Sequence, residues 1–145
     1  MTIPHEYRTA SQDFDRYIDA MRAITMIDSR NAHYTTTQGV FQAFRRRVPL
    51  ADALAFADAL PPVLRAIFVS HWQADEPRLP FTNRATMTAE VRDLRAHHNF
   101  APDTAISDVA RALRAVVNPR DFGHVLSSLS PEAAAFWAVE QAQQT

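Results

Sequence analysis

The fold of this chain is decided by a stretch that occurs twice: residues 32–68 read AHYTTTQGVFQAFRRRVPLADALAFADALPPVLRAIF, and residues 101–137 read APDTAISDVARALRAVVNPRDFGHVLSSLSPEAAAFW. Aligned without a gap, the two stretches place apolar residues on apolar residues and proline on proline. The aligned pairs include Val40 with Val109, Phe44 with Leu113, Val48 with Val117, Leu60 with Leu129, Pro62 with Pro131 and Phe68 with Trp137. This alignment predicts two copies of one helical unit.

Apolar residues recur at helical spacing along most of the chain. The clearest stripe predicts a helix near 31–48 and consists of Thr37, Phe41, Phe44 and Val48. Seven further helices are predicted near 13–25, 49–60, 62–73, 83–96, 102–117, 119–129 and from 130 onward. The sequence lacks the sustained alternation of apolar and polar residues that indicates strands. We therefore predict an all-α fold in which two tandem, internally repeated four-helix units pack as one compact helical domain.

Capping residues and prolines predict where the helices and the units begin and end. Ser11 and Asp13 are available as caps for the first helix, and Ser130 suits the start of the last. The third helix begins at Pro49, and its apolar stripe is Leu50, Leu54, Ala57 and Leu60. Segment 73–80 contains an acidic pair and two prolines and breaks the periodicity. We expect a first repeat over 11–73, a linker over 74–82, a second repeat over 83–139 and a frayed tail over 140–145.

The composition excludes several classes of function. The 145 residues carry a net charge of -1, so no overall field attracts nucleic acid or an anionic membrane. Cysteine is absent, which removes disulfides, thiolate metal sites and a cysteine nucleophile. All 15 basic residues are arginines, so lysine chemistry is excluded as well. The two glycines, Gly39 and Gly123, lie inside predicted helices and form no phosphate-binding loop.

The N-terminal segment and the hydropathy pattern indicate a location. Residues 1–16 are polar and carry Glu6, Asp13 and Asp15, unlike a signal or transit peptide. No apolar run approaches the roughly 20 residues that span a bilayer. We therefore expect a cytoplasmic protein with no membrane partner.

The duplicated unit and a few of its residues also resemble a known bacterial family. The residues that carry the resemblance are the helix stops Leu60-Pro61 and Leu129 to Pro131, and the aromatic ends Phe68 and Phe136-Trp137. The family is DUF2267, a domain of unknown function, and the resemblance covers most of residues 14–137. Many members have glycine and acidic residues between the second and third helices of each repeat, where this chain has Pro49-Leu50 and Asn118-Pro119. The resemblance implies an all-helical fold and carries over no activity, cofactor or catalytic residue.

His97 and His98 form the densest group of metal-binding residue types, with His71 and Glu76 near the linker as further candidates. Imidazole and carboxylate groups bind transition metals. Adjacent histidines point apart, however, and the sequence has no His-x-x-x-His or Glu-x-x-His pair. The simpler role of the two histidines is to end a helix, where donor side chains favour the carboxyl-terminal dipole. We therefore predict no metal or other cofactor and keep these four residues as the candidates for one.

Arg45, Arg46 and Arg47 form the only basic run, near the end of the second predicted helix. Arginines suit phosphate groups, but these three span nearly a full helical turn and no second basic patch accompanies them. We interpret the run as a solvated helix face and expect no nucleic-acid partner.

An acid–base enzyme needs titratable groups that folding brings together. Asp52 and Asp121 align with each other in the two copies, yet each follows a helix-starting proline, where the helix dipole stabilises a carboxylate by about 0.3–1 kcal/mol. Ser70 precedes His71, but no nucleophile elbow surrounds the serine. The sequence therefore gives no catalytic residue and favours a binding module over an enzyme.

Five aromatic residues lie near predicted helix ends or loops rather than within apolar stripes: Trp72, Phe81, Phe100, Phe136 and Trp137. Most are expected to cover the seam between the repeats, and any left exposed would form a partner groove. Such a groove suits an amphipathic helix, a second copy of the chain or a small apolar ligand. We therefore predict a non-catalytic protein-interaction or small-ligand-binding module. The alternative is an enzyme or a metal-dependent binder at the junction of the repeats, around His71, Glu76, His97 and His98.

Overall fold

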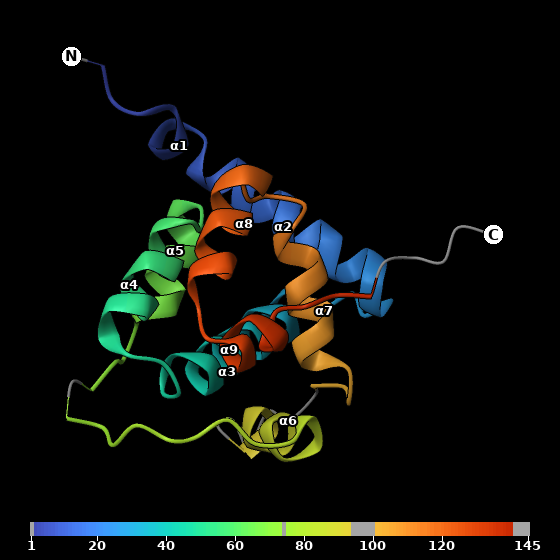
Figure 1. The fold of residues 1–145 in the computed structure, drawn as a ribbon. Coiled ribbons are helices and arrows are strands. Elements are labelled where there is room, and N and C mark those ends of the chain that lie inside the picture. The colour runs from blue at the N-terminus through green and yellow to red at the C-terminus, as the bar shows by residue number, and fades with distance from the viewer. Residues whose placement is uncertain (1, 74, 94–100, 141–145) are drawn as a thin grey trace.

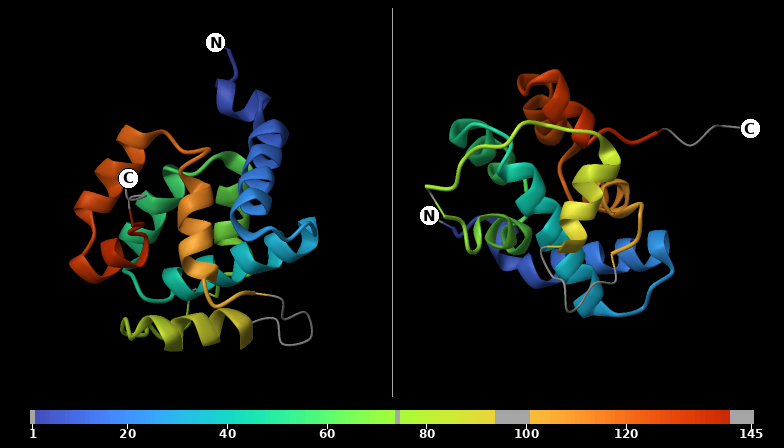
Figure 2. Two further views of the ribbon diagram at one scale, coloured as in Figure 1. Left: turned by 90° about the vertical axis from the view of Figure 1, so that its right-hand side faces the viewer. Right: turned by 90° about the horizontal axis from the view of Figure 1, so that it is seen from below.

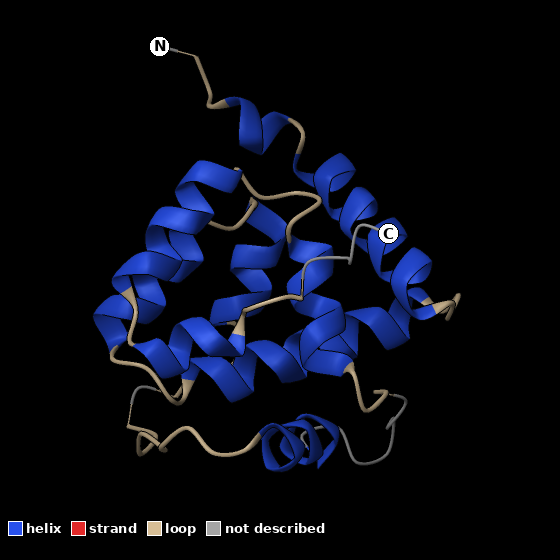
Figure 3. Ribbon diagram, turned by 45° about the vertical axis from the view of Figure 1, so that its right-hand side comes forward, coloured by secondary structure: helices blue, strands red, loops and turns tan. Residues whose placement is uncertain are grey.

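The computed structural model describes residues 2–73, 75–93 and 101–140, which form helices joined by loops (Figure 1, Figure 3). These residues form no strand and nine helices: α1 (His5–Arg8), α2 (Ala10–Thr25), α3 (Arg30–Arg45), α4 (Leu50–Asp58), α5 (Pro62–Val69), α6 (Arg84–Asp93), α7 (Ala105–Leu113), α8 (Pro119–Ser128) and α9 (Pro131–Phe136). The predicted all-α fold is confirmed. The helices α2 to α9 overlap the eight predicted ones, and α1 is an addition.

Helix α3 occupies the centre of the molecule and contacts α2, α5, α6 and α7. Helices α2 and α7 pack together, and α4 packs against α5 and α8. Helix α6 lies along the outside of α3, at the bottom of Figure 1. Residues 75–83, which lead into α6, run along the edge of the molecule past α4 and α9 (Figure 2). This connecting segment becomes one wall of the site described below.

The core is a cluster of aromatic rings from both predicted repeats. The ring centroid of Phe44 in α3 lies 4.9 Å from that of Phe56, 5.3 Å from that of Phe136 and 5.2 Å from that of Trp137. The ring of Phe56 stacks on Trp137 at 4.8 Å. Trp137 is 0% exposed and Phe136 is 1% exposed. Because rings of this size dominate core energetics, the two predicted repeats depend on each other for stability.

Side chains cap the helices at some of the predicted points. Ser130 Oγ accepts a hydrogen bond at 3.2 Å from a backbone N–H in the first turn of α9, which confirms it as a cap. The prediction that Ser11 and Asp13 cap the first helix is wrong. That helix, α2, already begins at Ala10, and Asp13 accepts a hydrogen bond at 3.0 Å from the Thr9 hydroxyl from within the helix.

Gly39 allows α6 to approach α3 closely. A Cβ at this position would stand 3.0 Å from both Cγ1 and the backbone oxygen of Val91, which is closer than ordinary packing allows. Around Gly123 in α8, no described atom would lie within 4 Å of the added carbon. The packing of α6 therefore requires the first glycine, and nothing packs against the second.

Candidate functional site

A groove with a volume of about 730 Å³ opens between α4, α5 and the connecting segment, and we call it the α4–α5 groove. Its apolar lining includes Leu50, Leu54, Val69 and Trp72, and its charged lining consists of Arg45, Arg46, Glu76 and Arg78. Figure 1 shows α4 and α5 side by side, with the segment passing below them. The volume lies within the range of about 300–1,000 Å³ that is typical of ligand sites.

The apolar side chains of the groove stand in solvent. Leu50 is 63% exposed, Leu54 is 50% exposed and Val69 is 42% exposed. Leu50 and Leu54 are four residues apart on α4 and share one face, whereas Ala53 and Phe56 reach the core from the other. The predicted stripe of this helix is therefore split, and its first two members face solvent. Since the apolar face of a surface helix normally packs against another surface, the face of α4 that carries Leu50 and Leu54 lacks a covering.

The structure separates the five aromatic candidates. Phe136 and Trp137 are buried at 1% and 0% exposure and pack against Phe44 of the first predicted repeat, so neither is an exposed aromatic of the α4–α5 groove. Trp72 is partly exposed and lines the α4–α5 groove. Phe81 is partly exposed and lines a different hollow, beside α9. Phe100 lies outside the described residues.

The arginine run 45–47 is buried, and the prediction of a solvated helix face is wrong. Arg45 is 4% exposed and Arg47 is 6% exposed. The guanidinium of Arg45 donates hydrogen bonds to the carbonyl oxygens of Phe68 and Ser70, each at 2.7 Å. The run therefore fixes the end of α5 to α3 and does not present a basic patch to solvent.

Two carboxylates complete this arginine cluster. Glu90 of α6 accepts hydrogen bonds from Arg47 at 2.6 Å and from Arg46 at 3.0 Å, and Glu76 forms an ion pair with Arg46 at 3.0 Å. Burial alone would raise the pKa of Glu90, but the hydrogen bonds and charges of the two arginines outweigh it and lower the pKa. Arg47 also donates to the carbonyl oxygen of Pro80 at 3.0 Å. The end of α3, the connecting segment and α6 are therefore bound to one another.

Two of the four metal candidates, His71 and Glu76, lie in the described residues and line one hollow, but no group of three ligands forms there among these residues. His71 is exposed and has a φ of 56°, and Glu76 is engaged in its ion pair. Over the described part of the chain, no three histidine, aspartate or glutamate side chains are grouped as ligands. His97 and His98 lie outside the described residues.

The other titratable candidates do not line the α4–α5 groove. Asp52 and Asp121 occupy the first turns of α4 and α8, as expected for carboxylates at helix starts. The hydroxyl of Ser70 donates to a backbone oxygen of α5 at 2.8 Å rather than to the adjacent histidine. Burial raises the pKa of Tyr17 and of Asp108, but these two residues belong to α2 and α7 and do not line the α4–α5 groove. The arrangement at the groove is suited to binding rather than to proton transfer.

Taken together, the described residues define an all-α domain with an open apolar groove beside a buried arginine cluster. The chain matches the family of uncharacterized conserved proteins DUF2267 over residues 14–136 and belongs to that family. The resemblance found from the sequence is confirmed. No curated protein matches the chain. In the part of the chain that the structure describes, none of the helices combines the length and the apolar character needed to cross a membrane.

Proposed function

We propose that this chain is a non-catalytic protein-interaction module and that an amphipathic helix of a partner protein binds in the α4–α5 groove. The observation that carries the proposal is the exposure of Leu50, Leu54 and Val69, at 63%, 50% and 42%, around a single hollow. Grouped exposed apolar side chains mark interaction sites on soluble proteins. Removing them from water contributes about 25 cal/mol per Å² of apolar surface to binding.

The open form of the groove favours a helix over a small ligand. Small-molecule sites bury about 70–90% of the surface of their ligand, which requires walls on several sides. Leu50 and Leu54 stand half in solvent, so they cover a ligand from one side only. An amphipathic helix needs an apolar surface on one side and keeps its polar face in water.

We also propose that the chain arose by duplication of one four-helix unit, which gave α2 to α5 and α6 to α9. The alignment of residues 32–68 with 101–137 supports this history. The described helices also agree with it, since α2 to α5 follow the short α1 before segment 74–82 and α6 to α9 come after that segment. The positions in the second copy that align with Leu50 and Leu54 are Pro119 and Gly123. The exposed pair Leu50 and Leu54 therefore occurs in the first unit alone. This supports a role of the pair in binding, since a pair needed for packing within each unit would occur in both.

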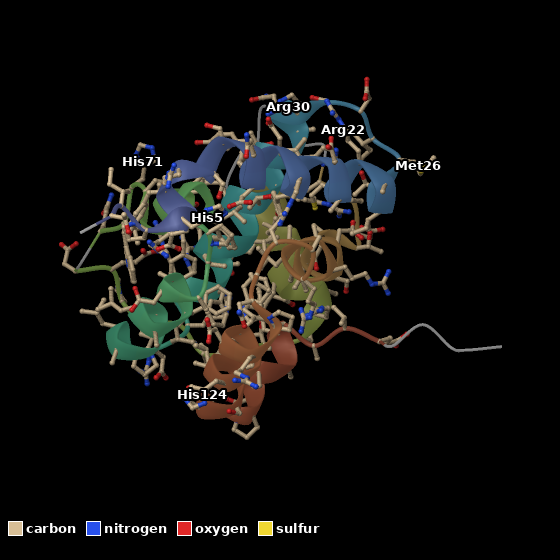
Figure 4. All side chains as sticks on the ribbon, turned by 90° about the horizontal axis from the view of Figure 1, so that it is seen from above. His5, Arg22, Met26, Arg30, His71 and His124 are labelled. Atoms are coloured by element: carbon tan, nitrogen blue, oxygen red, sulfur yellow. The ribbon has the colours of Figure 1, made fainter. Side chains whose placement is uncertain are left out.

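Photo-cross-linking at Leu54 tests the proposed interaction in the native cells. Benzoylphenylalanine at this half-exposed position is expected to capture a segment of another protein, which mass spectrometry of the cross-linked peptide should map to an amphipathic helix. The same group at Met26 serves as the matched control. Met26 is 86% exposed at the end of α2 and lies across the molecule from His71 (Figure 4).

Three results separate the possible occupants of the groove. A helix captured from Leu54 and not from Met26 supports the proposal. The same products from both positions, or no product from Leu54, would overturn it. Products that join two copies of this chain through Leu54 would show that the groove binds a second copy of the chain instead of a partner helix.

A further inference from the structure

The charges around the α4–α5 groove specify the chemistry of the partner. We infer that the partner helix is acidic and that a carboxylate beside its apolar stripe binds the guanidinium groups of Arg45 and Arg78. This inference rests on the proposed function.

Arg45 carries a positive charge that lacks an ion-pair partner among the described carboxylates. Its guanidinium donates to two backbone oxygens at 2.7 Å, and its Cζ lies 5.3 Å from the ring centroid of Trp72. Burial lowers the pKa of Arg45, and the negative charge of Glu76 only partly offsets this effect. A guanidinium nevertheless remains charged in a protein. Since a buried charge without a counter-ion is unfavourable, an incoming carboxylate would be stabilised at this position.

Arg78 supplies a second cation at the rim of the groove. It is exposed on the connecting segment, and no described carboxylate forms an ion pair with it. Arg46, in contrast, is paired with Glu76 and with Glu90 at 3.0 Å each. Arg45 and Arg78 are therefore the two arginines of the groove lining that have no ion pair with a described carboxylate: Arg78 is exposed at the rim, and Arg45 borders the groove from its buried position.

The net charge of the groove lining is also positive. Three arginines and a single carboxylate, that of Glu76, line the groove among the described residues, so the lining carries a net charge of plus two. A helix seated on Trp72 brings the residues beside its apolar stripe close to Arg45, because Arg45 packs over that ring. A carboxylate in this place forms charge-assisted hydrogen bonds, whereas a lysine meets charges of its own sign.

A nucleic acid would also present negative charge, but the floor of the groove does not suit it. Leu50, Leu54 and Val69 make the floor aliphatic, with Trp72 as the one aromatic ring of the lining in the described residues. Single strands bind through successive aromatic rings, and phosphates gain nothing from aliphatic side chains. The groove therefore favours an acidic amphipathic helix.

Three matched peptides test the inference. All three share one stripe of leucines at i, i+3 and i+7, and the positions beside the stripe are glutamate in the first, glutamine in the second and lysine in the third. Fluorescence anisotropy measures the Kd of each labelled peptide at low and high salt. A labelled single-stranded oligonucleotide is measured in parallel. The proteins are the wild type, Arg78→Glu, Leu54→Ser and the control Arg120→Glu, which changes an exposed arginine of α8 outside the groove.

We expect the glutamate peptide to bind the wild type about tenfold more tightly than the lysine peptide, with a smaller ratio at high salt. Arg78→Glu should reduce or reverse this preference, and Arg120→Glu should preserve it. Equal Kd values for the three peptides, with binding lost in Leu54→Ser, would overturn the charge inference and keep the proposed function. Absence of binding by every peptide would overturn both. Displacement of the glutamate peptide by the oligonucleotide would overturn the acidic helix in favour of nucleic acid.

Discussion

Replacement of Gly39 by alanine tests the close contact between α3 and α6. Inside a helix this change alone stabilises a protein by about 1 kcal/mol, because alanine has less backbone freedom to lose on folding. At Gly39, however, the added methyl would stand 3.0 Å from Cγ1 and from the backbone oxygen of Val91. The oxygen belongs to the backbone of α6, so rotation of a side chain cannot relieve the overlap. The whole helix would have to move.

The expected free-energy change is the balance of two effects. Overpacking of this kind costs about 1–3 kcal/mol. Movement of α6 would also strain the hydrogen bonds that Glu90, the residue before Val91, accepts from Arg46 at 3.0 Å and from Arg47 at 2.6 Å. After the helical gain is subtracted, Gly39→Ala should lower the free energy of unfolding by about 0–2 kcal/mol. Gly123→Ala, made where no described atom would contact the methyl, should raise it by about 0.5–1 kcal/mol.

Urea unfolding followed by far-UV circular dichroism measures both variants against the wild type. The informative quantity is the difference between the two alanine variants, since helix propensity contributes equally to both. We expect Gly39→Ala to be the less stable of the two by about 1–3 kcal/mol, with unchanged m values. Equal stabilisation by both substitutions would refute the reasoning, because α6 would then accommodate the methyl without cost.

Four further substitutions are predicted to change the free energy of unfolding in distinguishable ways. Trp137→Ala should cost about 3–5 kcal/mol in urea unfolding, because the ring is fully buried, and Trp72→Ala should cost clearly less. Glu90→Gln should cost about 2–3 kcal/mol at pH 7. Because the pKa of Glu90 is lowered in the folded protein, its contribution is present above the unfolded pKa, and the cost should vanish as the pH falls through the folded pKa. Asp108→Asn should have the opposite effect: burial raises the pKa of Asp108 in the folded protein, so the variant should gain stability relative to the wild type as the pH rises above the unfolded pKa of this carboxyl group. Parallel pH profiles for the last two variants would contradict both assignments.

Helix positions could be predicted from the sequence because they depend on local patterns. Periodic apolar residues located α2 to α9, and Ser130 followed by Pro131 located the start of α9, since caps and prolines act within a single turn. The prediction of caps for α2 was wrong although Ser11 and Asp13 are suitable residue types. The helix already begins at Ala10, after Thr9, so both residues lie within its first turn instead of before it.

The environment of the arginine run could not be predicted, because its partners are distant in the chain. Arg45 binds oxygens at positions 68 and 70, and Arg47 binds Pro80 and Glu90. Periodicity describes one helix at a time and contains no information on such acceptors. Three consecutive charged residues on a helix usually face water. Here the end of α5, the connecting segment and α6 supply oxygen atoms that bind the guanidinium groups in place of water.

The exposure of Leu50 and Leu54 in the groove could not be predicted, because α4 has apolar residues on two faces. The spacing that joins Leu50 to Leu54 is as regular as the one that joins Ala53 to Ala57, and either could belong to the core. In the structure, the face with Ala53 and Ala57 belongs to the core, because the neighbouring Phe56 packs into the aromatic cluster. The surplus of apolar residues in a helix of nine was the available signal for an exposed binding surface.

The position of Trp137 also affects how the protein is made. Its ring completes a cluster whose other members include Phe44, Phe56 and Phe68, all of which belong to the first half of the chain. The ribosome adds the 69 residues that follow Phe68, up to and including Trp137, in about 3–14 s at 5–20 residues per second. During that interval the rings of Phe44 and Phe56 lack the ring of Trp137 that packs against both of them in the folded protein. The first half therefore cannot complete its core until the second half has been synthesised.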